Sequence, residues 1–405
     1  MAGTRLLARG AASAAIAAIA IAASQPLAAQ QPPTAQQTQP TPPGWVFTPS
    51  IAVAETWDNN VLLRGEGSGS ISDFLTAVSP RGSLGYRGRR TTFHVDYRGS
   101  YYLYQELEDL NAFDQRAAVD FRHRITRMVS LFARESLSKS PTTDDVDLPG
   151  VEFRRLGVLH NDFRSGLEAR LNARTMMTGS YTFQQVRFDD DPTLPLGGIR
   201  GGGHAHGGSA QFEHRLQPRI AIGGEFDMRH ATVDETRGFD VRNTMGTVDY
   251  RVAERLQISG GAGYSWLSTS DTEQGRGAPA FRIGLNGSGA RVAWNIGYRK
   301  SFLPSFGFGG TFENQEFMAG FLAPLNRRLD WSGSFAVRES DPLVESDLGL
   351  QSIWARSSIS YLANRWIRIE AFYTAVFQDS QRPGGRINRS RAGVQVVTYK
   401  RLRVR

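Results

Sequence analysis

The chain has 405 residues and a net charge of +8, and arginine supplies nearly all of the positive charge because lysine occurs only at positions 139, 300 and 400. It contains no cysteine, which excludes disulfides and thiolate metal sites. The arginines are spread along the whole chain instead of clustering in one patch, which argues against nucleic acid as a partner.

The first segment, 1–29, has the pattern of a secretory signal peptide. Two arginines precede an apolar run at 11–23, and Ala29 ends a stretch of small residues suited to cleavage. The apolar run is too short to span a membrane as a helix, and a retained N-terminal anchor is the alternative interpretation. The next segment, 30–44, is rich in proline and glutamine and predicts a disordered lead-in because it has little apolar surface to bury.

The rest of the chain consists of runs in which apolar and polar residues alternate. The run at 91–105 places Phe93 and Tyr97 on one face of an extended chain and Asp96 and Arg98 on the other. Each run has about ten residues or more, the length that a tilted strand needs to cross a bilayer. Further runs of this kind lie at 219–229, 255–268, 291–302, 328–340 and 365–378.

Two kinds of connection alternate between the runs. Short joints rich in Arg, Asn and Pro alternate with longer polar or glycine-rich connections, which we expect at 58–72, 105–111, 139–152, 188–203, 230–239, 269–278, 301–311, 339–348 and 379–388. Outer-membrane barrels have short periplasmic turns and longer extracellular loops. The pattern predicts an all-β fold, a transmembrane antiparallel up-and-down β-barrel of about 18 strands (16 as the alternative) over 45–400, followed by a basic tail at 401–405.

A water-soluble sandwich or solenoid is the alternative to this barrel. A sandwich of so many strands needs several domains with linkers, which the sequence does not contain, and a solenoid needs a repeat of fixed period. We therefore expect water inside the barrel and lipid outside it, and we expect both termini to lie on the periplasmic side of the membrane. The side chains expected to face lipid in the run at 91–105 are Phe93, Val95, Tyr97, Tyr101 and Leu103.

The residues at 55–104 resemble the opening of a bacterial outer-membrane family described as β-barrel porin type 2. The matching residues are Asp58–Asn60 after the first run, Ser72–Phe74 before the second, Ser79–Pro80, and the run that contains Tyr97. The likeness in residues covers about two hairpins, and beyond them only the rhythm of strands and loops matches. The resemblance implies an outer-membrane barrel associated with exopolysaccharide export, and it supplies no catalytic residue.

The polar faces of the runs carry many arginines, and acidic residues such as Asp96, Glu168 and Glu316 share these faces. One interpretation is a network of ion pairs that makes a wet interior rigid. The other is a basic path for anions, since arginine raises the local concentration of anions and binds carboxylates with two hydrogen bonds. The arginines that we expect to line this path are Arg81, Arg98, Arg116, Arg122, Arg164, Arg229, Arg251, Arg299, Arg338 and Arg368.

Catalytic and metal sites have weak support in the sequence. His204 and His206 could begin a metal site, but no third ligand is indicated, and a glycine-rich loop or the start of a strand is the alternative interpretation. The acidic run at 189–191 could bind Ca²⁺, or it is a solvated loop. No arrangement of Ser, His and acid stands out, so we expect neither catalysis nor a cofactor.

Together these patterns predict a protein of the Gram-negative cell outer membrane. We expect a pore or accessory channel for export of an anionic exopolysaccharide, with a general diffusion porin and an outer-membrane hydrolase as alternatives. The expected partners are outer-membrane lipid and lipopolysaccharide, the barrel-insertion machinery, and polysaccharide or proteins of an export complex. Tyr399 would serve as the terminal aromatic residue for insertion, although residues follow it.

Overall fold

The computed structural model of the protein describes nearly all of the chain that follows the lead-in. The described ranges are 44–143, 153–189, 202–233, 237–269, 272–289, 291–306, 310–343, 349–380 and 385–404. The predicted signal peptide and all but the last residue of the predicted lead-in lie outside these ranges. Within them, no helix is long and apolar enough to cross a membrane.

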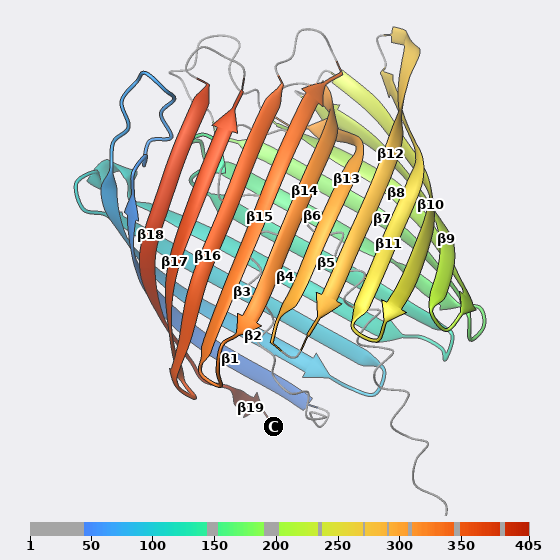
Figure 1. Cartoon of the computed structure of the whole chain (residues 1–405), viewed down its shortest axis with the longest axis horizontal. Coiled ribbons are helices and arrows are strands. Elements are labelled where there is room, and N and C mark those ends of the chain that lie inside the picture. The colour runs from blue at the N-terminus through green and yellow to red at the C-terminus, as the bar shows by residue number, and fades with distance from the viewer. Residues whose placement is uncertain are drawn as a thin grey trace, which may run out of the picture. The chain divides into compact units, whose positions relative to one another are not determined.

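The described residues form one antiparallel sheet that closes on itself (Figure 1). The strands are β1 (Gly44–Asp58), β2 (Asp73–Arg87), β3 (Thr91–Tyr104), β4 (Ala112–Arg124), β5 (Val129–Ser140), β6 (Val158–Arg170), β7 (Thr175–Phe188), β8 (Gly203–Gln217), β9 (Ile220–Val233), β10 (Arg237–Ala253), β11 (Leu256–Thr269), β12 (Thr272–Ser288), β13 (Ala293–Ser305), β14 (Gly310–Pro324), β15 (Leu329–Pro342), β16 (Leu350–Asn364), β17 (Ile367–Asp379), β18 (Arg386–Tyr399) and β19 (Leu402–Val404), with a 3-10 turn η1 (Glu108–Leu110) between β3 and β4. Consecutive strands pair in order, and β18 pairs with β1 from Ser50↔Tyr399 to Asp58↔Arg391. The predicted closed barrel of 18 antiparallel strands is confirmed.

Side chains alternate between two walls of this barrel. On β3, Tyr97, Tyr101 and Leu103 are exposed at 44, 52 and 47 %, while Asp96 and Arg98 point to the opposite side. We call the wall with the exposed apolar side chains the outer wall, and the opposite one the inner wall. The predicted alternation is present, because the strand period of two gives the sheet one apolar and one polar face.

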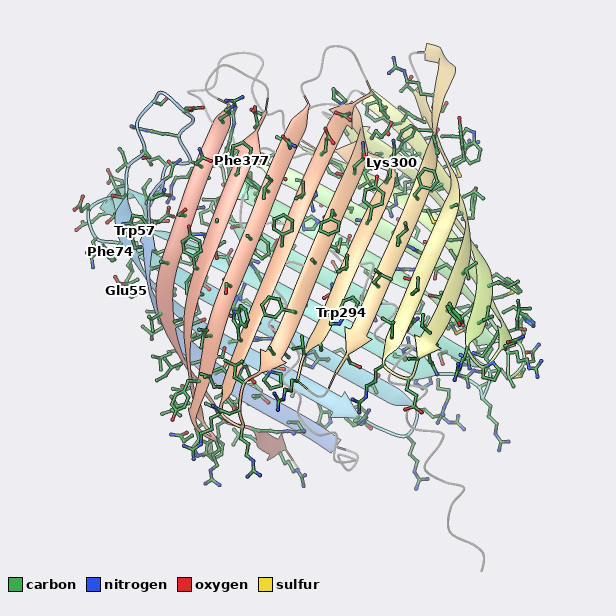
Figure 2. The ribbon with its side chains drawn as sticks, viewed as in Figure 1. Glu55, Trp57, Phe74, Trp294, Lys300 and Phe377 are labelled. Carbon is green, nitrogen blue, oxygen red and sulfur yellow. The ribbon has the colours of Figure 1, made fainter. Side chains whose placement is uncertain are left out.

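Aromatic side chains on the outer wall lie near both ends of the barrel (Figure 2). Trp294 lies toward the end with the short turns, whereas Trp57, Phe74 and Phe377 lie toward the other end. Trp57 and Phe74 are directly opposite each other on β1 and β2. Two aromatic belts that flank an apolar band are typical of barrels that cross an outer membrane.

Two charged residues labelled in Figure 2, Glu55 and Lys300, lie on the outer wall on the side of the belt that contains Trp57, and both have polar partners. The Glu55 carboxylate accepts a hydrogen bond from the Thr76 hydroxyl at 2.6 Å. Lys300 forms an ion pair with Glu313. Such partners reduce the cost of placing charge on an otherwise apolar surface.

At one end of the barrel, the strands are joined by connections of two to four residues, and we call it the short-turn end. We call the opposite end, which holds the longest connections, the long-connection end. Three of the predicted long connections, at 230–239, 269–278 and 301–311, are wrong. β9 runs to Val233 before β10 begins at Arg237, and β11 runs to Thr269 before β12 begins at Thr272. In these two segments, polar residues continue the strands beyond the aromatic belt, where the outer wall no longer needs to be apolar. In the third segment, β13 runs to Ser305 before β14 begins at Gly310, and Phe302 is only 2 % exposed.

The C-terminal tail contributes a strand that the sequence did not predict. β19 pairs with the first part of β1, from Trp45↔Val404 to Phe47↔Leu402. β1 extends past the end of β18 here, which leaves backbone groups on its edge that another strand can pair with. The described chain therefore begins, in β1, and ends, in β19, at the short-turn end.

The seam between the first and last strands has a buried polar clasp. Arg389 of β18 donates to one carboxylate oxygen of Asp58 at 2.8 and 2.5 Å, and the two residues are 3 % and 0 % exposed. Asn59 accepts a hydrogen bond from the Ser390 backbone N–H at 2.7 Å, and the Asn60 amide donates to a β18 carbonyl. The residues of the Asp58–Asn60 motif thus close the barrel.

Candidate permeation path

The inner wall carries the arginines that the sequence singled out. Parity and strand register put all ten on the face opposite the exposed apolar side chains. They come from nine separate strands, so they surround the interior instead of forming one patch. By strand they are Arg81 on β2, Arg98 on β3, Arg116 and Arg122 on β4, Arg164 on β6, Arg229 on β9, Arg251 on β10, Arg299 on β13, Arg338 on β15 and Arg368 on β17.

Three of these arginines form a row across neighbouring strands. Arg81 is directly opposite Arg98, and Arg98 is directly opposite Arg116. Nε of Arg81 lies 2.8 Å from a carboxylate oxygen of Asp96, and Nε of Arg116 lies 3.2 Å from a carboxylate oxygen of Asp114. Arg98 has no carboxylate within ion-pair distance among the described residues, and its Nε has no hydrogen-bond partner there.

A second group lies on the next strands of the same wall. Arg134 and Arg164 are directly opposite each other on β5 and β6. Arg134 pairs with Asp120 at 2.9 Å, whereas Arg164 donates to the Ser180 hydroxyl at 3.1 Å and has no carboxylate partner in the described part of the chain. Arg98 and Arg164 therefore have no ion-pair partner among the described residues on this side of the interior.

Most of the remaining inner-wall arginines are paired with acids. Arg122 makes two hydrogen bonds of 2.7 Å with the Glu168 carboxylate. Glu316 accepts from Arg299 at 3.1 Å and from Arg338 at 2.7 Å. The ion-pair network that the sequence suggested is thus present, together with four of the ten arginines, Arg98, Arg164, Arg251 and Arg368, that have no ion-pair partner among the described residues.

Water-sized molecules reach the inner wall. The side chains of Arg81 and Arg122 are 41 % and 40 % exposed although they point away from the outer surface. Asp120 is 51 % exposed on the same wall. Because a close-packed interior would leave these side chains with almost no accessible surface, the inner wall is open to water at these positions.

Near the long-connection end, the segment Phe153–Gly157 crosses the interior. We call it the mouth segment. The backbone N–H of Phe153 donates to the Gln378 side chain of β17 at 2.9 Å. The Arg154 carbonyl accepts from the Thr143 N–H at 2.9 Å. The segment, which leads into β6, therefore contacts a strand far from β6 around the barrel, and it narrows the mouth on this side.

Arg155 fixes the middle of the mouth segment. Its guanidinium donates to the Leu110 carbonyl at 2.7 Å and to the Tyr104 hydroxyl at 3.2 Å. It also lies 5.0 Å from the centre of the Tyr104 ring, a favourable cation–π distance. Sequence patterns gave no signal for this role, since Arg155 lies outside any strand and its partners are 45 and 51 positions away.

A dry apolar cluster holds the other end of the mouth segment. Leu156 packs with side chains from the inner wall of β6 to β11 and with two phenylalanines at the end of β13. All of them are almost fully buried, so this part of the mouth is closed to water. The cluster consists of Leu156, Val158, Val186, Phe188, Ala205, Ala231, Val233, Phe239, Val241, Leu267, Phe302 and Phe306.

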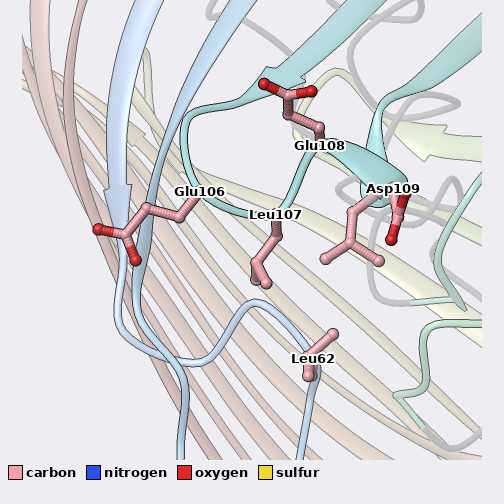
Figure 3. Close-up of a pocket in the computed structure, with 6 residues that line it drawn as sticks. Leu62, Glu106, Leu107, Glu108 and Asp109 are labelled. Carbon is pink, nitrogen blue, oxygen red and sulfur yellow. The ribbon is translucent and has the colours of Figure 1, made fainter.

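A pocket of about 340 Å³ lies outside this path, on the connections β1–β2 and β3–β4 (Figure 3). Leu62 and Leu107 point into it, whereas the carboxylates of Glu106 and Glu108 point away from it. Its walls come from connections and not from the inner wall. Solutes that pass the arginine row do not need to enter it.

The residues considered for a metal site lie elsewhere. His204 and His206 belong to β8 and lie on the outer wall, where His206 is 5.5 Å from His230 of β9 between ring centres. No group of three potential ligands is arranged for a metal ion in the part of the chain that the structure describes. Of the acidic run at 189–191, only Asp189 is among the described residues.

Comparison with known protein families finds no family model that matches this chain, and no curated protein matches it. Similar solved structures include OccAB4 of Acinetobacter baumannii, with 9 % identity and a TM-score of 0.47 over 89 % of this chain and 98 % of that one. OpdK of Pseudomonas aeruginosa, solved with vanillate, has 10 % identity and a TM-score of 0.46 over 88 % and 99 %. Likeness at this level carries no argument about function, and the resemblance to the porin type 2 family stays without support.

Proposed function

We propose that the protein is an outer-membrane channel that favours small anionic solutes. Its sheet closes on itself, so each strand of the barrel pairs its backbone with a neighbour on either side, which is the requirement for crossing hydrocarbon in extended form. The apolar outer wall between two aromatic belts supports residence in a membrane. On this proposal the short-turn end and both ends of the barrel chain lie in the periplasm, and the long-connection end is extracellular.

The observation that carries the anion preference is the row Arg81, Arg98 and Arg116 on a water-accessible wall. Three guanidinium groups on adjacent strands raise the local concentration of anions. Arg98 has no carboxylate within ion-pair distance among the described residues, so its hydrogen-bond donors are available to a passing carboxylate or phosphate. Ion pairs elsewhere on the wall hold Arg122, Arg229, Arg299 and Arg338 in place.

Export of an anionic exopolysaccharide is the narrower form of this function, and it rests on the family resemblance alone. A polymer would have to pass the mouth segment, which is held at Phe153, Arg155 and Leu156. Two competing functions make different predictions. A general diffusion porin would conduct ions without strong preference for anions. An outer-membrane hydrolase would have a blocked interior and would not conduct.

Ion selectivity in planar bilayers tests the proposal. We expect a reversal potential that shows anion preference in a salt gradient, and a loss of preference in the double variant Arg98→Ser with Arg164→Ser. A charge 4 Å from a permeating ion contributes about 1 kcal/mol in water, so each removal lowers the anion permeability ratio by up to about fivefold at low salt. The matched control, Arg127→Ser with Arg327→Ser, removes two charges from short turns and should change little.

Two results would contradict the proposal. A barrel that inserts but never conducts would exclude a channel. A reversal potential that is the same in the wild type, the inner-wall double variant and the control would exclude the arginine row as the source of selectivity.

A further inference from the structure

At the long-connection end of β7 to β10, the outer wall carries basic side chains in place of apolar ones. We call this group the basic rim; it consists of Arg187, His204, His206, His230 and Arg242. His206 is directly opposite His230. Arg242 is directly opposite Met228 and Trp266, which are exposed outer-wall side chains. The basic rim therefore belongs to the outer wall and not to the interior.

Parity places the other two members on the same wall. His204 is two residues from His206 on β8, and Arg187 shares its face of β7 with Tyr181, which is 47 % exposed. Arg187 and His204 are each one residue from the end of their strand. The basic rim thus occupies the margin of the wall, beyond the apolar side chains of the same strands.

The height of the basic rim follows from the strand bounds. Arg242 stands level in register with Trp266, and His230 is two residues nearer than Met228 to the end of β9 at Val233. Figure 1 shows that the neighbouring hairpin of β11 and β12 continues to the top of the barrel. A charged side chain on the outer wall costs about 2–4 kcal/mol at mid-membrane but only about 0–1 kcal/mol at the interface. The basic rim fits the head-group region.

The charge of the rim is positive. On the outer wall of β7 to β10, Asp240 is the carboxylate among the described strand residues, and it lies 3.1 Å from Nδ1 of His230. Arg187 and Arg242 have no acid within ion-pair distance in the described part of the chain. Across the barrel, the outer wall of β13 to β15 has the opposite balance, since Glu313, Glu339 and Asp341 share a wall with Lys300.

We propose that the basic rim binds the phosphate groups of lipid A, the membrane anchor of lipopolysaccharide, in the outer leaflet. This inference rests on the outer-membrane location that the proposed function includes, but not on anion permeation. Arginine forms paired hydrogen bonds with phosphate, and neither the Arg187 nor the Arg242 guanidinium has an ion-pair partner among the described residues. Trp266 and Phe183 lie beside the rim on the same wall and would contact the acyl chains below the phosphates.

Thermal unfolding in vesicles tests this proposal. The protein is reconstituted in phosphatidylcholine vesicles with or without lipopolysaccharide, and the Tm is measured from tryptophan fluorescence. We expect lipopolysaccharide to raise the Tm of the wild type, and we expect the double variant Arg187→Gln with Arg242→Gln to lose at least half of that rise. The matched control, Lys300→Gln with Arg386→Gln, removes two outer-wall cations that are paired with acids away from the rim and should keep the full rise.

Further vesicles identify the ligand chemistry. Enzymatically dephosphorylated lipopolysaccharide should raise the Tm no more than phosphatidylcholine does. A full rise with the dephosphorylated lipid, or an unchanged rise in the rim variant, would overturn the proposal. So would a rim variant that loses self-association in light scattering but keeps its lipid response, because the rim would then contact a second barrel. Conductance of the same variants reports separately on the channel.

Discussion

The buried clasp at the seam predicts a large loss of stability when one partner is removed. In the variant Asp58→Asn, the neutral amide keeps the shape of the carboxylate but removes the negative charge that the Arg389 guanidinium, 3 % exposed, contacts. Breaking a buried pair on one side costs about 3–5 kcal/mol. Here the 2.8 and 2.5 Å contacts and the burial of both side chains place the expected loss in that range. Urea unfolding of the barrel in detergent, followed by heat-modified migration in gels, measures it.

An exposed ion pair beside the same seam serves as the control. Arg386 and Asp379 are 2.8 Å apart but 62 % and 22 % exposed. Solvent screens exposed pairs, which contribute little to stability, so Asp379→Asn should lower the unfolding free energy far less. Equal losses in Asp58→Asn and Asp379→Asn would refute the argument that burial of the clasp holds the seam.

Three further expectations follow from the walls, the mouth and the tail. Arg155→Ala removes the hydrogen bonds to Leu110 and Tyr104, so single-channel conductance should rise. The control Arg127→Ala should leave the conductance unchanged. Equal conductance of the wild type and Arg155→Ala would show that the mouth segment does not narrow the path. Val248→Arg, at a site 49 % exposed on the outer wall, should destabilise the barrel in lipid by about 2–4 kcal/mol, and Ser268→Arg near the strand end by about 0–1 kcal/mol; equal free energies of unfolding would contradict the placement of the apolar band. Removal of 401–405 deletes β19 but leaves the β1–β18 pairing, so heat-modified migration should persist, and its loss would mean that β19 closes the barrel.

The strands were predictable because one physical constraint repeats along the chain. A wall that faces lipid on one side and water on the other imposes alternation, as in β3, where every second residue from Phe93 to Leu103 is apolar or glycine. The constraint ends where the wall leaves the apolar band. For this reason the ends of β9 to β12 resembled loops in the sequence although they are strands.

Contacts between distant segments could not be predicted. Asp58 and Arg389 are 331 positions apart, and Phe153 and Gln378 are 225 apart. Neither alternation nor composition gives the register that brings such residues together. Parity did put the ten selected arginines on one wall, but which of them have acidic partners depends on neighbouring strands, as the difference between Arg98 and Arg122 illustrates.

Site-specific labelling tests the arrangement of lipid outside and water inside most directly, because the native chain contains no cysteine. Arg98→Cys and Tyr97→Cys place thiols on adjacent residues of opposite walls. A water-soluble, negatively charged thiol reagent added during planar-bilayer recording should change the current through the Arg98→Cys channel and leave the Tyr97→Cys channel unaffected. Modification of Tyr97→Cys with an inert Arg98→Cys would contradict the account.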